Sequence, residues 1–486
     1  MYKKRLSIYQ RIFILSSCLV LGACASRPTG YQSVEDASTT RGGFLGVIEN
    51  GVFHDILYGP ESISLNFPGY IVGLNKGRHH DVGRGAAYPE PQPGESEGLQ
   101  GVKKRMRSNP KIHYVSHVVR NGGNLYALDN CALFTVYGIW NGGDSTAGEP
   151  PIGPCSDAPL IVGAMASAQA DSTSGLEALR QDIRRVIAKR PANVPYTHVI
   201  LMAMGWNTPQ IEAIRNFNAI VAQIKRAAGA QRFDPLFVGV SWPSVWTASW
   251  LDPAIKIVSY FPKADDADEV GTIWISPIAQ MLAEEAPAQT RLVAIGHSFG
   301  ARAVISAICS DSVWKVRSKA SAATSAQAFR PWDTFIGWQP AFSINRFKEK
   351  GSRDGFLYTD GCLDRVNTIV LTASKNDKAV DSAIWADLAG AYEVYSSICS
   401  SPSALLGSTK CIGGNTVNAA SVANLPIEPG KINYIDASSI VFFNQPGTGG
   451  GAHSDVYRAV HGRLNWNAMN RVVEREAASS KTISSD

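Results

Sequence analysis

The sequence predicts an α/β protein with a mostly parallel, doubly wound β-sheet. Six short apolar runs have the length of strands, and segments of helix length separate them. Most of these runs are continuous rather than alternating, as expected for parallel strands that are buried on both faces. They cover residues 198–204, 236–241, 291–296, 333–338, 366–373 and 437–443.

The third run leads into the most informative stretch of the chain. Leu292–Ile295 is followed by Gly296-His297-Ser298-Phe299-Gly300 and then by a small-residue helix pattern. A strand, a tight turn and a helix with serine at the apex form the context of the G-x-S-x-G nucleophile elbow. Such a turn strains the serine backbone, and side chains at Gly296 and Gly300 would collide. We therefore expect Ser298 to be a nucleophile.

A nucleophilic serine needs a histidine that accepts its proton and an acid that orients the histidine. In the fold that this elbow implies, the acid and then the histidine follow the serine along the chain. Only His453 and His461 follow Ser298. His453 is the expected base, because it lies in a glycine-rich loop after the last apolar run, whereas His461 lies in the expected next helix. The glycines form no phosphate loop, since no Lys-Ser/Thr pair follows them.

The acid is expected just beyond the carboxyl end of an intervening strand. The β-branched run 366–373 ends shortly before Asp377, which is the first candidate. Asp381 is the alternative, and either residue could instead form a turn or cap a helix.

The oxyanion needs backbone donors. One is expected from the N–H of Phe299, at the start of the elbow helix. The second is expected from Trp206, in the turn that Gly205 permits after the run 198–204. The alternative is that Gly205-Trp206 is an ordinary strand-to-helix turn.

Together these pieces resemble the α/β-hydrolase superfamily, particularly its bacterial serine esterases and lipases. The resemblance covers approximately residues 195–470, and many relatives carry His-Gly where this chain has Met204-Gly205. It implies an α/β-hydrolase fold and hydrolysis of carboxylic esters by Ser298, His453 and Asp377, with no cofactor. Two alternatives use the same residues differently. One is an acyltransferase with the same triad, and the other is a catalytically silent cell-envelope binding module.

Two insertions are expected to act as lids over the site, residues 243–288 and 379–432. The first is rich in aromatic side chains, which suggests an apolar ester or lipid substrate; the alternative is a packed core under a long loop. These aromatic residues are Trp246, Trp250, Tyr260, Phe261 and Trp274.

The N-terminus predicts export. Four basic residues and a short apolar core precede Leu21-Gly22-Ala23-Cys24, so residues 1–23 have the features of a signal peptide of lipoprotein type. Cys24 would then carry the lipid, and Ala25 after it resembles lipoproteins sorted to the outer membrane, facing the periplasm or the surface. Cleavage after Ala25 is the alternative and would give a soluble periplasmic protein.

The remaining chain divides by composition. Residues 24–42 are expected to be a tether, and residues 43–175 a Gly- and Pro-rich N-terminal extension with strands at 112–120 and 125–139. These strands form either the leading edge of the sheet or a small separate domain. Residues 176–475 are the expected catalytic domain and residues 476–486 a disordered tail.

Charge argues against nucleic-acid binding. The chain has 46 basic and 41 acidic residues, but four of the basic ones lie within residues 1–23, which leaves 42 against 41. The sequence does not indicate an oligomeric state. It also gives no zinc-like cysteine spacing, and His79-His80-Asp81 lacks a second ligand cluster, so no metal is expected.

Six cysteines of the exported chain form an even set, which favours disulfides in an oxidising compartment. Six cysteines allow fifteen pairings. Proximity along the chain favours Cys131–Cys155 and Cys399–Cys411, which leaves Cys309–Cys362.

Overall fold

The computed structural model describes a large part of the chain. The described residues are 65–77, 112–123, 130–136, 153–163, 167–205, 208, 210–242, 264–309, 330–347, 358, 361–380, 387–401, 409–413, 416–443 and 451–470. The expected signal peptide, the lipidation site Cys24, the tether and the C-terminal tail lie outside these ranges. Within them, no helix has both the length and the apolar character needed to cross a membrane.

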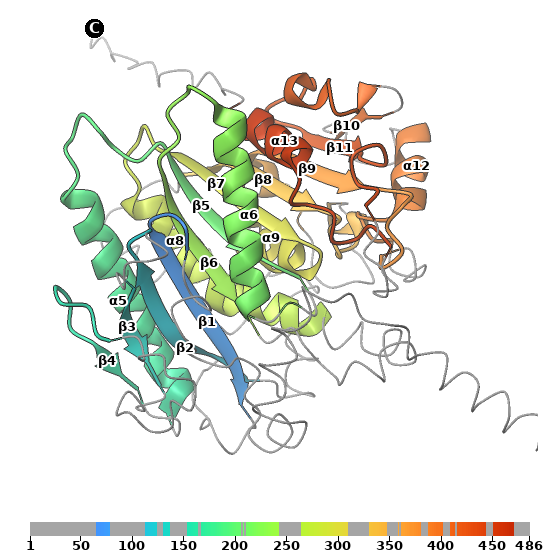
Figure 1. The fold of residues 1–486 in the computed structure, drawn as a ribbon. Coiled ribbons are helices and arrows are strands. Elements are labelled where there is room, and N and C mark those ends of the chain that lie inside the picture. The colour runs from blue at the N-terminus through green and yellow to red at the C-terminus, as the bar shows by residue number, and fades with distance from the viewer. Residues whose placement is uncertain are drawn as a thin grey trace, which may run out of the picture.

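A mixed, mostly parallel sheet of 11 strands forms the centre of the molecule, in the order β10-β11-β9-β8-β7-β5-β6-β1-β2-β3-β4 (Figure 1). Every neighbouring pair from β10 to β1 is parallel, and β2 runs antiparallel to both β1 and β3. The strands are β1 Gly69–Gly77, β2 Ile112–Asn121, β3 Cys131–Thr135, β4 Ile161–Val162, β5 His198–Ala203, β6 Pro235–Ser241, β7 Arg291–His297, β8 Trp332–Trp338, β9 Val366–Ala373, β10 Thr409–Ile412 and β11 Ile432–Asp436.

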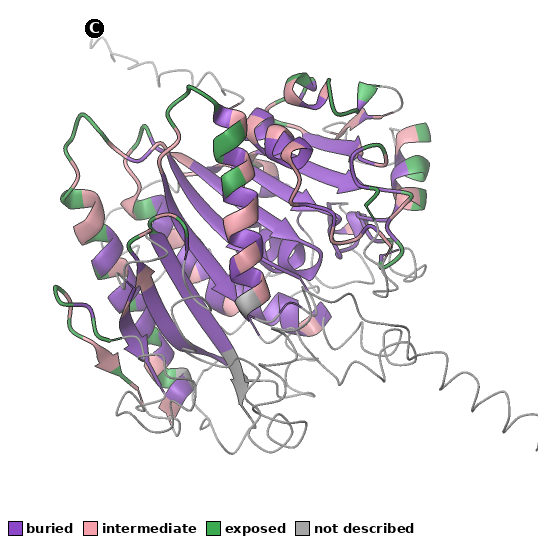
Figure 2. Ribbon diagram, viewed as in Figure 1, coloured by how far each residue is buried: buried purple, intermediate pink, exposed green. Residues whose placement is uncertain are grey.

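Helices cover both faces of this sheet, so the α/β class is confirmed. The two hydrophobic clusters, one on each face, follow from strands whose side chains are buried on both sides (Figure 2). Helices α6 and α13 pack on one face, and α5, α8 and α9 pack on the other. Their bounds are α5 Ala168–Ala188, α6 Gln210–Ala228, α8 Ser276–Glu285, α9 Phe299–Cys309 and α13 Ala459–Met469.

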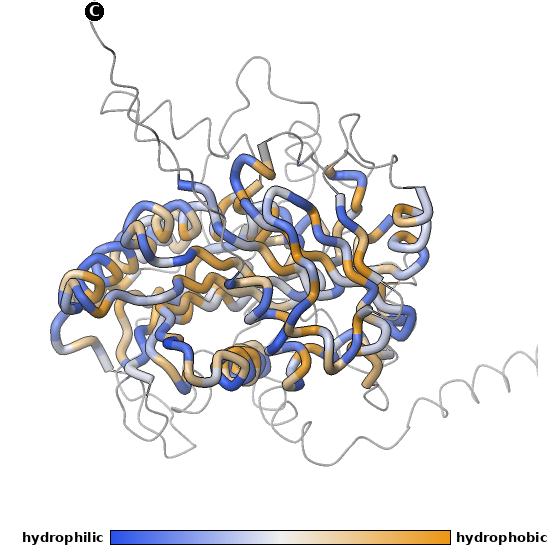
Figure 3. Tube along the Cα trace, turned by 90° about the horizontal axis from the view of Figure 1, so that it is seen from above, coloured by the Kyte–Doolittle hydropathy of each residue, from blue (hydrophilic) through white to orange (hydrophobic). Residues whose placement is uncertain are grey.

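The helices form where apolar residues recur at helical spacing along the sequence. In α6, Ile214, Phe217, Val221 and Ile224 repeat at helical spacing and are all buried, while Lys225 and Arg226 are exposed. α9 differs because every one of its residues is buried. From above, hydrophobic segments run along the strands in the middle layer (Figure 3). Five short elements complete the order: η3 Val270–Ile275, η4 Ile344–Phe347, α11 Gly361–Arg365, α12 Tyr392–Ser400 and η7 Val422–Asn424.

Five of the six expected strands are present as β5 to β9, but the expected strand at 437–443 is wrong. The chain turns directly after β11, because the N–H groups of Ile440 and Val441 both bond to the carbonyl oxygen of Ala437, at 2.9 and 2.7 Å. Ile440 and Val441 are fully buried in this turn. The apolar run therefore reflects a buried turn rather than a strand.

The N-terminal strands extend the same sheet. β1 pairs in parallel with β6, and β2 and β3 continue beyond it. Of the expected strand at 125–139, the described residues include β3, Cys131–Thr135, whereas residues 125–129 and 137–139 lie outside the described ranges. The described N-terminal strands are thus continuous with the sheet that carries the candidate site.

The described parts of the two expected lids belong to the packed fold. Residues 264–285 form a buried helical connection between β6 and β7, and Trp274 is 5 % exposed within the core. The other four aromatic residues of this insertion lie outside the described ranges. From the insertion 379–432, β10 extends the sheet and α12 packs beside β11 through Tyr395 and Tyr434. Their buried apolar residues pack these described segments against the sheet, whereas a movable lid would need no such packing.

Three disulfides join the six cysteines of the described chain. They are Cys131–Cys155, Cys309–Cys362 and Cys399–Cys411, with Cα–Cα distances of 4.7, 4.6 and 5.8 Å. These are the pairs expected from proximity along the sequence.

Candidate active site

The topology places a switch point at the carboxyl ends of β5 and β7. These strands are neighbours, but the chain continues from β5 to β6 on one side and from β7 to β8 on the other. The connections therefore leave in opposite directions, and ligands of open α/β sheets bind at such a switch point. The loops after β5 and β7 carry Gly205 and Ser298.

Ser298 occupies a strained turn between β7 and α9. Its φ angle is 55°, in the left-handed region that residues other than glycine rarely adopt. Its N–H donates to the carbonyl oxygen of Trp338 (2.9 Å), and its own carbonyl oxygen accepts from Ala341 (3.1 Å). These bonds to the loop after β8 hold the serine in this conformation.

Both glycines of the motif are required by close approach. A Cβ atom at Gly296 would collide with Ala301 in the first turn of α9. One at Gly300 would collide with the carbonyl oxygens of Ala203 and Met204, at the end of β5. The spacing of the two glycines thus allows α9 to start directly against the sheet.

The loop after β5 also lies against Ser298. A Cβ atom at Gly205 would be 2.6 Å from Ser298 Cβ and 3.2 Å from its Oγ. The indole of Trp242 holds this loop, since its Nε1 donates to the carbonyl oxygen of Met204 (2.8 Å). Trp206, the expected second oxyanion donor, lies outside the described residues. Phe299, the expected first donor, is the first residue of α9.

His453 and Asp377 are brought together from loops that are distant in sequence. His453 Nδ1 lies 2.7 Å from Asp377 Oδ2. Asp377 is fully buried, and its Oδ1 accepts from the N–H groups of Ala379 (2.9 Å) and Val380 (3.3 Å). The carboxylate is therefore fixed by the backbone and fixes the imidazole in turn. The His453 side chain is 15 % exposed, so it remains open to a reactant.

Gly451 explains the glycine-rich sequence before His453. Its φ is 60°, and a Cβ atom there would collide with the carbonyl oxygen of Asn376. Gly451 forms a bridge with Asp377, and the next N–H, of Ala452, donates to Asn376 (2.8 Å). The two loops that carry the base and the acid thus pair through their backbones.

His297 is a site residue that the sequence pattern did not single out. Its Nε2 lies 2.8 Å from the carbonyl oxygen of His453, and the two rings are 4.7 Å apart. Burial, with His453 as a second cause, lowers the pKa of His297 to about 3, so the ring is neutral. Because the acceptor is a carbonyl oxygen, Nε2 carries the proton and donates. The sequence feature that could have identified His297 is its position directly before Ser298, inside the elbow motif.

The alternative base, His461, has a structural environment. It is fully buried in α13, its Nδ1 accepts from the N–H of Arg458 (3.0 Å), and its Nε2 donates to Ile440 (2.9 Å). Both nitrogens are thus used by the backbone. Asp381, the alternative acid, lies outside the described residues.

The arrangement has a defined chemical capacity. Because Asp377 accepts from His453 Nδ1, the Nε2 atom of that ring is left to accept a proton. Ser298 follows His297, which contacts His453, so hydroxyl and base stand at one end of the sheet. Among the described residues no hydrogen bond joins Ser298 to His453; such bonds are often long before substrate binds.

Comparison with known proteins adds no family. None of the protein-family models matches the chain, and no curated protein is significantly similar to its sequence.

Proposed function

We propose that this chain is an exported serine hydrolase of the α/β-hydrolase type that cleaves carboxylic esters. The observation that carries the proposal is the 2.7 Å contact between His453 Nδ1 and Asp377 Oδ2, beside a serine in the left-handed conformation. A histidine oriented by a buried carboxylate is the arrangement that activates a serine nucleophile. Cys24 would carry a lipid anchor for the exported enzyme.

In the proposed reaction, Ser298 Oγ attacks the acyl carbonyl while His453 Nε2 takes the hydroxyl proton. The tetrahedral oxyanion is held by the N–H of Phe299 and by that of Trp206. The same proton then passes from His453 to the departing alcohol, which leaves an acyl-enzyme. Water attacks this ester and gives a proton to His453, which passes it to Ser298 Oγ as the carboxylic acid is released.

Asp377 has the same role in both steps. It orients the imidazole and stabilises the positive charge that forms on it, without taking the proton itself. The fully buried position of its carboxylate and its two backbone donors suit this role, because the acid cannot rotate away.

Active-site labelling tests the proposal. The purified chain, Ser298→Ala and His453→Ala are incubated with a fluorescent fluorophosphonate, and the labelled residue is mapped. We expect labelling at Ser298 in the wild type and none in either variant, because the hydroxyl needs its base. Hydrolysis of short-chain aryl esters should fall by about 10⁴- to 10⁶-fold in both variants.

Detergent distinguishes a covered site from a silent one. Wild type that remains unlabelled in buffer is tested again with micelles present. Labelling that appears only then would support a hydrolase with a covered site. A folded wild type that is never labelled, or labelling that persists in Ser298→Ala, would refute the proposal and favour a binding module.

A further inference from the structure

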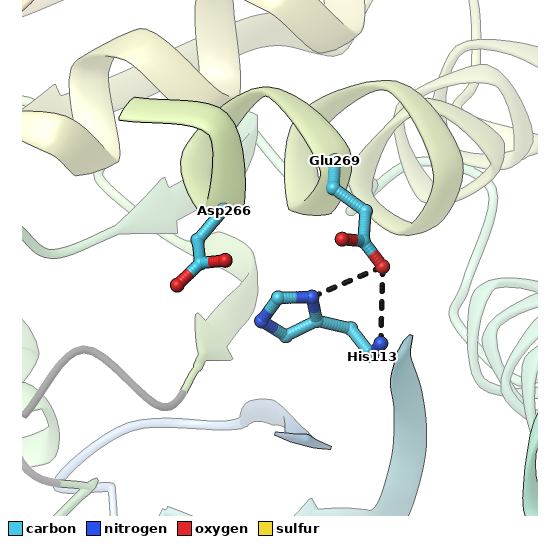
Figure 4. Close-up of side chains that lie close together, drawn as sticks. All are labelled: His113, Asp266 and Glu269. Atoms are coloured by element: carbon cyan, nitrogen blue, oxygen red, sulfur yellow. Dashed lines mark hydrogen bonds and ion pairs between the residues drawn. The ribbon is translucent and has the colours of Figure 1, made fainter. Parts of the chain in front are cut away.

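A buried group of one histidine and two carboxylates lies away from the candidate active site. It consists of His113 on β2 and of Asp266 and Glu269, which are contributed by a helical segment, residues 264–269, just before η3. One ligand atom from each residue lies within 4.8 Å of the other two. In Figure 4 the imidazole of His113 lies between the two carboxylates.

These three side chains are shielded from water. His113 and Asp266 are fully buried, and Glu269 is 2 % exposed. Burying carboxylates is costly unless a cation or strong donors compensate for the lost hydration. Among the described residues, Glu269 makes its polar side-chain contacts with His113 alone.

The contact between His113 and Glu269 is close but misaligned. Nδ1 of the ring lies 3.1 Å from Glu269 Oε1, yet neither ring nitrogen of His113 makes a hydrogen bond. Glu269 Oε1 instead accepts from the backbone N–H of His113 (3.0 Å). Two ligands of one tetrahedral ion would be about 3.3 Å apart at bond lengths of roughly 2.0 Å. The 3.1 Å between His113 Nδ1 and Glu269 Oε1 is close to that spacing, and the atom from Asp266 lies within 4.8 Å of both.

We propose that His113, Asp266 and Glu269 bind a divalent transition-metal ion. An imidazole and two carboxylates offer nitrogen and oxygen ligands, a donor set that suits a divalent cation. Imidazole favours zinc-like ions over calcium or magnesium, which prefer oxygen ligands alone. Zn²⁺ is therefore the probe of choice.

The position of the group indicates a structural role. Lys76 of β1 pairs with His113, and Gly73 pairs with Ser241 at the end of β6, so the group lies at the same sheet edge as Ser298. Four strand spacings separate β7 from β2, or roughly 19 Å. An ion there is too distant to take part in chemistry at Ser298.

The ion would instead fasten two parts of the fold. It would join β2, one of the first strands along the chain, to the segment that leads into η3. η3 packs closely on α9, since a Cβ atom at Gly271 would collide with the carbonyl oxygen of Ala303. The metal would thus connect the first strands of the sheet to the helix that begins at Phe299. Such an ion would be bound whether or not the chain is a hydrolase.

Metal binding is measured on the purified chain without reductant, so that the described cysteines stay in disulfides. After treatment with a chelator, Zn²⁺ is added in calorimetric and thermal-unfolding titrations. We expect one equivalent to bind and to raise the Tm by several degrees, because a ligand of the folded state stabilises it. Glu269→Gln and His113→Asn should weaken binding by at least about 10- to 100-fold.

Two matched variants locate the ion. His198→Gln removes another buried histidine whose Nε2 lacks a partner, and His453→Ala removes the histidine of the candidate active site. Both should bind Zn²⁺ as the wild type does. The proposal is overturned if the stripped wild type neither binds Zn²⁺ nor gains Tm. It is equally overturned if binding survives in Glu269→Gln and His113→Asn, or is lost in His453→Ala.

Discussion

The imidazole of His297 donates a hydrogen bond to the main-chain carbonyl oxygen of His453, at 2.8 Å. The residue before the candidate nucleophile thereby holds the backbone of the candidate base. Asp377 holds the side chain of the same histidine from the other loop. His453 is therefore fixed at two points, one on its backbone and one on its ring.

Replacing His297 should impair turnover more than substrate binding. His297→Phe keeps a ring but removes the donor, so the His453 backbone loses one anchor. We expect kcat to fall by up to about 100-fold with little change in KM, because small misplacements of a catalytic group are costly. His297→Gln, which retains an N–H donor, should recover part of kcat. Equal losses in both variants would contradict a role for this bond.

Asp377→Asn should lower kcat by about 10⁴-fold while the fold persists, because an amide stabilises the wrong tautomer of the histidine. Steady-state kinetics and circular dichroism measure the two effects. Asp381→Asn is the matched control and should retain activity. The opposite result, with Asp381→Asn inactive and Asp377→Asn active, would exchange the two assignments.

Gly205→Ala should impair catalysis through direct collision. The added methyl group would lie 2.6 Å from Ser298 Cβ and 3.0 Å from the carbonyl oxygen of His297. Either the loop or the serine must move, so we expect kcat to fall by about 10- to 100-fold. Gly153→Ala is the control, because the methyl group added there would meet no atom within 4 Å among the described residues. Ester hydrolysis should be normal in that variant.

Stability should decline in mild acid. Burial lowers the pKa of His297 to about 3 and those of His117, His198 and His461 to about 4, against an unfolded value near 6.5. The unfolded chain thus binds more protons, and the stabilisation present above pH 6.5 is lost as the pH falls towards 4. Between pH 4.5 and 5.5 these four groups should contribute a slope of up to about 5 kcal/mol per pH unit.

Urea unfolding at several pH values measures this slope. His198→Gln removes one of the four titrating groups. His198 lies at the edge of the sheet opposite to Ser298. The slope should then fall by about 1.4 kcal/mol per pH unit. An unchanged slope would show that His198 is not buried in its neutral form.

The sheet centre was predictable because its strands carry continuous apolar runs. β5 to β9 lie within about one residue of their expected bounds, since a buried parallel strand leaves no polar alternation to blur them. The same rule, that a continuous apolar run predicts a buried strand, was wrong for the turn after β11. Ile440 and Val441 are as apolar as the residues of a buried strand. Only their backbone hydrogen bonds to Ala437, formed after β11 ends, show that they belong to a turn.

Sequence could also indicate site residues that belong to local motifs. Ser298 lies between its glycines, and His453 follows Gly451, whose backbone conformation requires glycine. The group at His113 had no such signal. Its partner Glu269 lies 156 residues along the chain, and only the pairing of β2 into the sheet brings them together.

β1 is the first described strand, yet its parallel partner β6 follows much later, with Gly69 opposite Phe237. β1 can pair with β2 early, but its parallel pairing with β6 must wait until β6 has been synthesised. Closing so long a loop is slow, because its entropy must be paid before the pairing stabilises it. In this topology the first described strand of the sheet therefore reaches its parallel partner only after the middle of the chain has been made.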